Sequence, residues 1–403
     1  MINQNKYLVI LVDFDGLDNL FTTWKNHLKI FDKNFKNIAI INTHNLKFAS
    51  KVRNKYKFNT KNFKNIKLFN LKNTQEFINF CKNKKVLVIN CFGKTYEELK
   101  IHLLLKKLNL NQIQITTTGN EQYSNTTSNK FLKQKINYLI KKRFFYFFTN
   151  ILSFLNIINK IDARFISNKN IITYINKSWF KKFLYEKQFF FAKKLFLVNS
   201  IAYDNSIINK DKISQDFIVH IDTSLNYFNK TVIRGKLPEN SVKKHYLYLN
   251  IFLEKISKHL KKKVIVCIHP AYDMNLHKKY LRNFKVYKFK TREFIRKAYL
   301  VSFFDSTTIL DAVLLNKRIV GLVSKFSSDN DIKRQNAWSN NIKCVKQILS
   351  DPFVYNRKEI NKLKLYKKNN YKKYIETYLK RKSNKLGIQE IVEYIKIYFN
   401  YDK

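Results

Sequence analysis

Short apolar runs alternate with helical patterns between Lys263 and Val323, and this alternation restricts the possible folds more than any other feature. The runs, rich in β-branched residues, are Val264–Ile268, Tyr299–Phe304 and Ile319–Val323. Runs of this kind, separated by helical patterns, are typical of a parallel sheet with crossover helices. The sequence therefore predicts an α/β fold in which all strand carboxyl ends lie on one sheet edge, where ligands bind.

Polar residues follow two of these runs directly. His269 and Pro270 come after the first run, and Asp305-Ser306-Thr307-Thr308 comes after the second. Acidic and hydroxyl side chains cap helix amino termini, and helix starts attract phosphate. His269 can donate to a phosphate or ribose oxygen, while Pro270 ends the strand. Plain helix caps and a polar loop are the alternative, but together the two groups predict a site for a phosphorylated ligand.

The first 120 residues show the same alternation and indicate a separate α/β domain. Strands are predicted at Tyr7–Phe14, Asn37–Asn42, Val86–Cys91 and Gln112–Thr117, with helices around Leu20–Phe31, Thr74–Lys82 and Tyr96–Leu108. The first strand ends in Asp13-Phe14-Asp15-Gly16. This stretch could hold a catalytic carboxylate at Asp13 or Asp15, bind Mg²⁺ through the pair, or simply end the strand in a turn.

The same four residues are similar to the nucleophile motif of haloacid-dehalogenase-type phosphatases. That family also needs a later acidic pair on the same sheet edge. Asp329-Asn330-Asp331 is the candidate for it, several residues beyond the run that ends at Val323. A phosphatase using Asp13 and Asp15 is therefore an alternative function.

Composition and charge bound the class of protein. The chain has 403 residues, 45% of them hydrophobic, and a formal net charge of +50. This length allows two or three domains with a large core. The charge is typical of proteins that bind nucleic acid, an anionic membrane or anionic substrates. Abundant Lys, Asn, Ile, Phe and Tyr with few Gly and Pro indicate that compositional drift supplies part of the charge.

Cysteine usage and hydropathy indicate a cytoplasmic protein. Cys81, Cys91, Cys267 and Cys344 form no CxxC pair or zinc spacing. Cys91 and Cys267 lie in or beside apolar strands, which predicts buried thiols rather than metal ligands. We expect no signal peptide, no membrane-spanning helix, no metal and no resident cofactor.

A basic and aromatic segment interrupts the α/β pattern at about residues 130–190. Lysines and an arginine up to Arg143 lead into Phe144-Phe145-Tyr146-Phe147-Phe148. A helix lying in the interface of an anionic membrane fits this pattern, and so does a core helix with a basic exposed end. On the first alternative the protein would be peripheral on the inner face of the cytoplasmic membrane.

A second domain is predicted to begin after about residue 205. Its first strand, Phe217–Ile221, ends in Asp222-Thr223-Ser224, a further strand end with acid and hydroxyl groups. A helix over residues 240–262 and a strand at Lys285–Phe289 follow. Thr291-Arg292-Glu293 opens another helix, with Thr291 as a plausible cap. Arg292 could reach a phosphate and Glu293 a ribose, although a solvated first turn explains both residues more simply.

The order of these motifs resembles GT-B-type glycosyltransferases of bacterial surface-carbohydrate (capsule or lipopolysaccharide) biosynthesis. The pieces that carry the resemblance are Asn199-Ser200-Ile201-Ala202-Tyr203-Asp204, Phe217–Asp222, Lys263–Pro270, Thr291–Ile295 and Asp305–Thr308. The His-Pro element is similar to that of sialyl- and polysialyltransferases, and the Ser-Thr element to that of CDP-glycerol polymerases. The resemblance covers about a third of the chain.

The resemblance implies two Rossmann-like domains with parallel sheets that face each other across a cleft. Residues 1–205 would form the acceptor domain, including the insert at about 130–190, and residues 206–403 the nucleotide-sugar domain with basic C-terminal helices. The resemblance assigns the nucleotide to His269, Pro270, Ser306, Thr307 and Thr308. The strand-end pattern adds Thr223, Ser224, Arg292 and Glu293. No Asp/Glu-Asp/Glu-Gly element lies in the middle of the first domain, so the resemblance assigns no catalytic base. A carboxylate of the first domain, Asp13 or Asp15, is predicted to take the acceptor proton.

The predicted reaction is sugar transfer from a CMP-, CDP- or UDP-linked donor to a polysaccharide or lipid-linked acceptor. A basic nucleic-acid-binding protein is the non-enzymatic alternative. We expect nucleic acid not to be the partner, because the lysines are spread along the chain and the aromatic residues occur in solid runs rather than interleaved with lysine.

Overall fold

The computed structural model describes the chain in segments. They are residues 5–12, 24–43, 62–91, 96–116, 151–153, 155–169, 192–208, 214–223, 237–268, 274–363, 371–381, 383 and 385–400. The described residues form two compact units. The N-terminal unit takes those up to 116, those from 151 to 204 and those from 378 onward, and the C-terminal unit takes those from 205 to 377.

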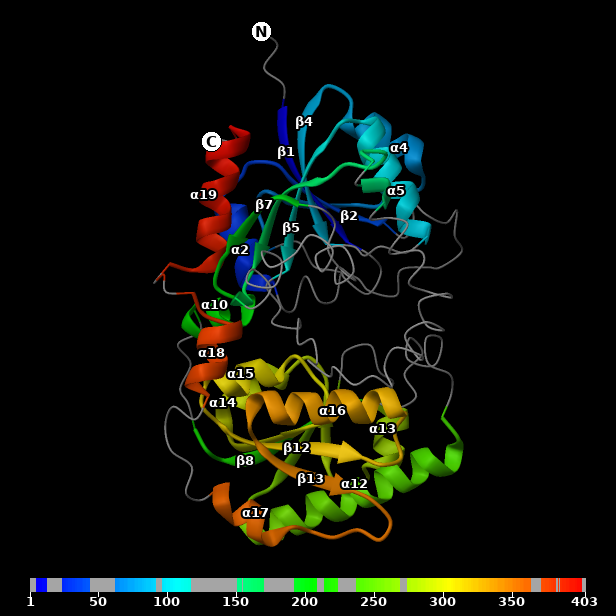
Figure 1. The fold of residues 1–403 in the computed structure, drawn as a ribbon, viewed down its shortest axis with the longest axis vertical. Coiled ribbons are helices and arrows are strands. Elements are labelled where there is room, and N and C mark those ends of the chain that lie inside the picture. Colours follow the sequence, from blue (N-terminus) through cyan, green and yellow to red (C-terminus); the bar gives the residue numbers. More distant parts are fainter. Residues whose placement is uncertain are drawn as a thin grey trace. The chain divides into compact units, whose positions relative to one another are not determined.

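The N-terminal unit contains a seven-stranded sheet in which every strand pair is parallel (Figure 1). Its strand order is β3-β2-β1-β4-β5-β6-β7. The strands are β1 (Asn5–Val12), β2 (Ile38–Asn42), β3 (Ile66–Phe69), β4 (Lys84–Cys91), β5 (Asn111–Thr116), β6 (Ile161–Ile166) and β7 (Ala192–Leu197). The first six follow the Rossmann order, in which the order of strand addition reverses between β1 and β4.

Helices cover both faces of this sheet. On one face α2 (Lys25–Asn34) and α19 (Gly387–Phe399) pack side by side, and their apolar side chains join those of Leu8 and Ile10 in one cluster. On the other face α4 (Thr74–Cys81) and α5 (Tyr96–Lys107) pack on Val9 and Leu11. Because β1 is buried on both faces, it has the continuous apolar sequence typical of a central parallel strand.

The C-terminal unit contains a second fully parallel sheet, of six strands. Its order is β10-β9-β8-β11-β12-β13, which is again the Rossmann order. The strands are β8 (Phe217–Asp222), β9 (Val264–Ile268), β10 (Lys285–Tyr287), β11 (Ala298–Phe303), β12 (Arg318–Ser324) and β13 (Val345–Leu349). The order in which the chain adds strands reverses between β8 and β11, and ligands of such sheets bind at the carboxyl ends of these two strands.

The longest helix of this unit covers one face of its sheet. α12 (Glu239–Leu260) buries Tyr246, Leu249 and Phe252 against apolar residues of β8, β9, β11 and β12. The remaining helices of the unit are α13 (Met274–Tyr280), α14 (Thr291–Lys297), α15 (Ile309–Leu314), α16 (Asp329–Ile342) and α17 (Arg357–Lys362). α16 packs so closely on β12 that a Cβ atom at Gly321 would collide with the side chain of Ser339.

The chain changes unit within two helices, α10 (Ile201–Ile208) and α18 (Lys372–Tyr378). The first change, after Asp204, lies one residue from the predicted boundary. The second differs from the sequence-based division, which gave every residue from 206 onward to the second domain. The last helix, α19, instead completes the apolar core of the N-terminal unit.

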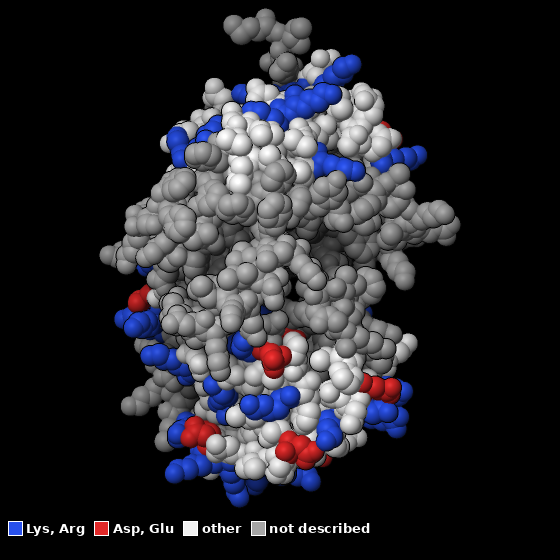
Figure 2. Space-filling model, turned by 45° about the vertical axis from the view of Figure 1, so that its right-hand side comes forward, with Lys and Arg blue, Asp and Glu red and all other residues white. Residues whose placement is uncertain are grey.

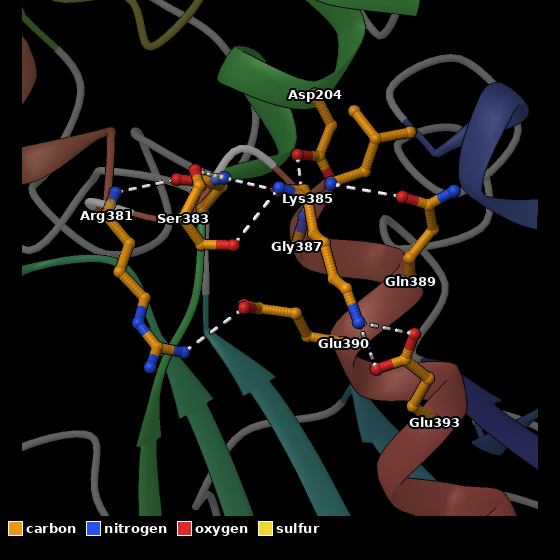
Figure 3. A network of polar contacts seen from close by, with 10 residues as sticks. Asp204, Arg381, Ser383, Lys385, Gly387, Gln389, Glu390 and Glu393 are labelled. Carbon is orange, nitrogen blue, oxygen red and sulfur yellow. Dashed lines mark hydrogen bonds and ion pairs between the residues drawn. The ribbon is translucent and has the colours of Figure 1, made fainter.

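A buried carboxylate fixes this returning segment (Figure 3). Asp204 accepts hydrogen bonds from the backbone N–H groups of Gly387 (2.9 Å) and Ile388 (3.0 Å), and its Oδ2 lies 3.0 Å from His27 Nε2. A carboxylate at a helix amino terminus satisfies otherwise unbonded N–H groups and complements the helix dipole. Asn199 adds bonds to the backbone of Arg381 (2.6 Å) and Lys385 (2.6 Å).

Several predicted elements need correction. Three strands escape the sequence pattern: β3, β6 and β13. The acidic residues Asp329 and Asp331, singled out beyond the run that ends at Val323, lie in the first turn of α16, which begins at Asp329 behind the cap residue Ser328. The predicted basic-aromatic insert lies mostly outside the described residues. Among the described residues, no helix is long and apolar enough to span a membrane.

Candidate nucleotide site

Four of the predicted residues with a hydroxyl group follow the two strands at which the C-terminal sheet reverses its strand order. Thr223 follows β8 directly, and Ser306-Thr307-Thr308 follow β11 after Phe304 and Asp305. β8 and β11 are hydrogen-bonded neighbours, and Ile221 is in register with Phe303. Since adjacent strands are about 5 Å apart, these two strand ends border the same crevice.

Five predicted site residues lie outside the described part of the chain. They are Asp13, Asp15, Ser224, His269 and Pro270. Their neighbours are described: β1 ends at Val12, and β9 ends at Ile268, which is in register with Asp222. The roles proposed for these five residues therefore remain predictions.

The turn between β11 and α15 differs from the predicted helix start. Thr308 is the N-cap residue and makes no side-chain cap bond, while Ser306 Oγ accepts from the Thr308 N–H at 3.3 Å. The next three N–H groups bond to carbonyls three residues back, so the turn is tight and these donors are already used. The N–H groups from Thr308 to Asp311 are therefore not available to a ligand, whereas the turn presents hydroxyl groups, and Thr307 is exposed.

Asp305 has a structural role in this turn. Its carboxylate, 4% exposed, pairs with the guanidinium of Arg334 on α16. Arg334 also lies 3.4 Å from Asp331, whose carboxylate accepts from the Ser328 hydroxyl at 2.8 Å. The ion pairs thus tie the end of β11 to the start of α16.

The helix predicted to begin after Thr291 begins one residue earlier than expected. Lys290 is the N-cap of α14, so Thr291 is the first helical residue and not the cap. Arg292 Nε lies 3.0 Å from Asp311 Oδ2, whereas Glu293 is exposed and pairs with Lys297 at 3.3 Å. Burial raises the pKa of Asp311 and the Arg292 charge opposes that rise. The described contacts of Glu293 match the solvated first turn.

A small hollow lies beside this pair. It is lined by Asn205, Ser206, Arg292, Arg296, Asp311 and Leu315, all in the C-terminal unit. Two guanidinium groups and one carboxylate give it a positive balance, which suits an anionic group near the Arg292 end of α14.

An aromatic side chain that the sequence pattern did not single out lies between β10 and α14. Phe289 is 58% exposed and has a left-handed backbone with φ of 61°. The other described non-glycine residues with positive φ are asparagines and lysines, which tolerate it better than a bulky aromatic residue. A strained backbone held at a ligand-binding edge is a feature of functional loops. The predicted strand Lys285–Phe289 hid this residue, because the strand ends at Tyr287.

A buried polar cluster lies near the carboxyl edge of the C-terminal sheet, on the face that α12 covers. On the α12 face of the sheet, apolar side chains occupy the amino-terminal halves of the strands, and polar ones replace them toward the carboxyl ends. These polar residues are His220, Asp222, Ser302 and Ser324. Side chains two residues apart on a strand share a face, so His220 and Asp222 both point toward α12.

Asp222 is the centre of this cluster. Its Oδ2 accepts from the Tyr246 hydroxyl at 3.1 Å and lies 3.0 Å from His277 Nε2. His220 Nε2 lies 3.8 Å from its other oxygen, and His220 Nδ1 lies 3.0 Å from Ser302 Oγ on β11. Burial alone would raise the pKa of Asp222, but the imidazoles of His220 and His277 outweigh burial and hold that pKa below its ordinary value. The cluster fixes the end of β8 immediately before Thr223.

The carboxyl edge of the N-terminal sheet is built from different groups. Thr43, after β2, donates its hydroxyl to the Val12 carbonyl at 3.1 Å, and Asn90 on β4 donates to Gln112 at 3.3 Å. The guanidinium of Arg164 on β6 is buried and donates twice to Gln114 Oε1. These bonds link the end of β1 to the residue after β2, and link β4 and β6 to β5.

The cysteines match the predicted thiols in part. None of the four is in a disulfide; Cys81 and Cys267 are buried, whereas Cys91, predicted to be buried, and Cys344 are half-buried. Burial raises the pKa of Cys267 to about 12, so this residue is an unreactive thiol. Within the described segments no group of three or more His, Cys, Asp or Glu side chains is arranged to hold a metal ion.

The phosphatase motif does not come together in the described structure. β1, which precedes Asp13, belongs to the N-terminal sheet, while Asp329 and Asp331 open α16 beside the C-terminal sheet. The acidic pair therefore lies on a different sheet from the proposed nucleophile, so this alternative has no support in the fold.

The fold defines the class to which the chain is similar: two Rossmann-like α/β domains, the GT-B-like arrangement that the sequence predicted. No family model matches the sequence, and no curated protein matches it.

Solved structures with this fold do match. MnaA of S. aureus, in a co-structure with UDP, is 12% identical with a TM-score of 0.50, and the match covers 98% of this chain and 97% of that one. A Listeria monocytogenes protein provisionally assigned as a UDP-N-acetylglucosamine 2-epimerase gives 11% and 0.52, over 99% and 98%. The wall teichoic acid polymerase TagF gives 11% and 0.51, over 96% and 88%. At these identities the likeness establishes the fold.

Proposed function

We propose that the protein is a nucleotide-sugar-dependent glycosyltransferase that binds its donor at the carboxyl edge of the C-terminal sheet. The observation that carries the proposal is the pair of hydroxyl-bearing strand ends, Thr223 and Ser306–Thr308, at the strand-order reversal of a Rossmann sheet. That crevice is where sheets of this order bind nucleotides. One protein of like fold was solved with UDP, which makes UDP the first donor nucleotide to test among UDP, CDP and CMP.

Each part of a nucleotide has a fitting group along this edge. The hydroxyls of Thr223, Ser306 and Thr307 suit diphosphate oxygens, and Arg292 supplies positive charge. His269, which follows β9, would donate to a phosphate or ribose oxygen. Phe289 follows β10, two strands from β8 and so about 10 Å away. That distance suits a base stacked on its exposed ring while the diphosphate lies at β8 and β11.

The reaction would be displacement at the anomeric carbon of the donor sugar. An acceptor hydroxyl oxygen forms the new bond, the bond to the diphosphate breaks, and the nucleoside diphosphate leaves. A carboxylate of the N-terminal unit, Asp13 or Asp15, would take the acceptor proton. Arg292 would offset the charge that develops on the leaving diphosphate. The acceptor would be a surface polysaccharide or a lipid-linked precursor, a class to which the wall polymer of one protein of like fold belongs.

A nucleotide thermal-shift panel tests the donor site. UDP, CDP and CMP would be added to the purified full chain, with ADP and inorganic phosphate as comparisons. A ligand at 100 times its Kd stabilises by about 2.7 kcal/mol, so the matching nucleotide should raise the Tm by several degrees. Thr223→Val and His269→Ala should remove most of that shift. Ser257→Ala, a hydroxyl bonded to its own turn at 2.8 Å, is the matched control and should keep it.

Several outcomes would overturn the proposal. A panel in which no nucleotide shifts the Tm, or in which the site variants respond like wild type, removes the donor site. If UDP-sugar is bound but only epimerised at the sugar, the site is right and the transfer reaction is wrong. Mg²⁺-dependent hydrolysis of a simple phosphate ester that Asp13→Asn abolishes would restore the phosphatase alternative.

A further inference from the structure

The amino edge of the N-terminal sheet is lined by lysines. Each of its seven strands has a lysine at its first or second residue, or a few residues before it. These lysines are Lys64, Lys36, Lys6, Lys84, Lys107, Lys160 and Lys193, in the order of β3, β2, β1, β4, β5, β6 and β7. With strands about 5 Å apart, the row is about 30 Å long. Figure 2 shows basic side chains gathered at this end of the unit, on the face in view.

The two acidic side chains described along this edge are already bonded. Asp32 accepts from the backbone N–H groups of Lys64 (3.1 Å) and Asn65 (2.7 Å). Asp162 pairs with Lys193 at 2.7 Å. Lysines near helix carboxyl termini are favoured by the helix dipole, which accounts for Lys107 on α5. That explanation does not reach Lys6 or Lys160, which are at or beside strand starts.

Exposed aliphatic side chains project from the same edge. The turn before β6 contains Leu155, 58% exposed, and Ile157, 45% exposed. Asn156 between them has φ of 59°, and Asn159 bonds to the carbonyls of Leu105 and Leu110, so the turn is fixed at the start of β5. Leu103 on α5 is also exposed and is on the face of that helix that carries Leu99, which packs with Leu152 beneath the turn.

Lysines around an exposed aliphatic tip fit one kind of partner, an anionic lipid bilayer. Aliphatic side chains insert at the boundary between headgroups and acyl chains, and each lysine near an anionic surface adds about 1 kcal/mol. The amino edge of the C-terminal sheet also carries lysines, among them Lys258, Lys263 and Lys285. The exposed aliphatic turn, however, accompanies the lysines of the N-terminal unit, so charge alone does not define the surface.

We propose that the amino edge of the N-terminal sheet, with Leu155 and Ile157 in the turn before β6, is a docking surface for anionic lipid membranes. It lies at the opposite end of the strands from the carboxyl edge, so membrane contact leaves the carboxyl ends of this sheet uncovered. The inference does not depend on the nucleotide site, because it uses other residues and another ligand.

Vesicle sedimentation of the full chain tests the surface. Vesicles of phosphatidylcholine with phosphatidylglycerol (3:1) should bind the wild type, and vesicles of phosphatidylcholine alone should bind it far more weakly. Leu155→Ser with Ile157→Ser should lower the partition coefficient at least about tenfold. Lys6→Gln, Lys107→Gln and Lys160→Gln together should lower it about 100-fold, because three lysines are removed. All are surface changes, so the circular dichroism spectrum should not change.

Matched variants of the C-terminal unit are the controls. Leu247→Ser with Val354→Ser replaces aliphatic side chains that are 54% and 70% exposed, and Lys258→Gln, Lys263→Gln and Lys285→Gln replaces three exposed lysines. Both should bind vesicles like wild type. The proposal is overturned if these controls lose binding as strongly, since the charge then acts without a surface. It is also overturned if vesicles of phosphatidylcholine alone bind the wild type as well as the anionic vesicles do. Binding of single-stranded RNA by a chain that does not bind anionic vesicles would overturn it too.

Discussion

In the N-terminal unit the buried polar side chains toward the strand carboxyl ends are mainly amides and a guanidinium, with the hydroxyl of Thr43, whereas in the C-terminal unit they are imidazoles, hydroxyls and a carboxylate. The two sheets share the Rossmann order over six strands. Asn90, Gln114 and Arg164 supply the amides and the guanidinium, and His220, Asp222, His277 and Ser302 supply the second set. One backbone arrangement thus supports two different chemistries. The side chains at the strand ends, and not the sheet itself, would therefore determine which unit binds the proposed donor.

The largest expected effect on the free energy of unfolding comes from removing a central side chain from each of the two clusters. Asp222→Ala leaves the His277 imidazole and the Tyr246 hydroxyl buried without their carboxylate, and should cost about 3–5 kcal/mol of unfolding free energy. Gln114→Ala removes a neutral partner of Arg164 and should cost less, about 1–3 kcal/mol. Urea unfolding measures both. Asp351→Asn, at an exposed ion pair, should leave the midpoint unchanged. Equal losses at the two clusters would contradict the contrast between them.

Two glycines sharpen the comparison through packing. A Cβ atom at Gly387 would collide with the backbone carbonyl of Asn199, whereas one at Gly321 would meet the side chain of Ser339. A backbone obstacle cannot rotate away, so Gly387→Ala should cost about 2–3 kcal/mol and Gly321→Ala about 1 kcal/mol. Adding Ser339→Ala should recover part of the loss at Gly321. Recovery of Gly387→Ala by any nearby side-chain truncation would show that the returning segment is less tightly held.

A buried lysine makes the stability of the C-terminal unit depend on pH. Lys317 Nζ donates to the carbonyls of Ser214, Arg296 and Ala298, at 3.0, 2.6 and 2.8 Å. Burial lowers the pKa of Lys317 to about 8 from its ordinary 10.5. Between these values the unfolded chain binds more protons than the folded one, so stability rises with pH, by about 1–3 kcal/mol. Lys317→Met should remove this rise in urea unfolding at pH 7.5 and 10. A wild-type stability that falls over this range would contradict the assignment.

The smallest expected effect on stability is at Phe289, where a substitution should change nucleotide affinity without changing the free energy of unfolding much. Phe289→Gly relieves a left-handed backbone but raises the entropy of the unfolded chain, so stability should stay within about 1 kcal/mol of wild type. Loss of the stacking ring should raise the Kd for UDP about tenfold. Isothermal titration measures the affinity, and Phe289→Tyr is the control that should retain it. Unchanged affinity in the glycine variant would remove the base platform.

The sequence predicted the apolar strands well and the polar ones poorly. β1, β2, β4, β5, β8, β9, β11 and β12 have apolar runs that a fully buried strand requires. β6 was missed because it contains Asp162 and Arg164, whose burial depends on contacts with Gln112 and Gln114 on the neighbouring strand. β13 was missed because Gln347 bonds to Val354 and Asn356 in the segment that follows. A local pattern does not contain such partners.

The candidate site was predictable to the same extent. Strand-end position alone brought Thr223 and Ser306–Thr308 to one crevice, since parallel strands end on one edge. The cluster around Asp222 could not be assembled, because His277 and Tyr246 come from two other helices. The alternation of His220 and Asp222 was its one visible signal. Phe289 was hidden because its backbone conformation does not follow from its residue type.

Hydrogen exchange of the full chain with and without saturating UDP tests the central claim most directly, because it reports both sheets in one experiment. We expect slower exchange in peptides that cover 217–223, 285–293 and 298–310 of the C-terminal unit. The strand carboxyl ends of the N-terminal sheet, at residues 38–43 and 86–91, should change little with the nucleotide alone. Protection confined to the N-terminal sheet, or no protection at saturating UDP, would contradict a donor site on the C-terminal unit.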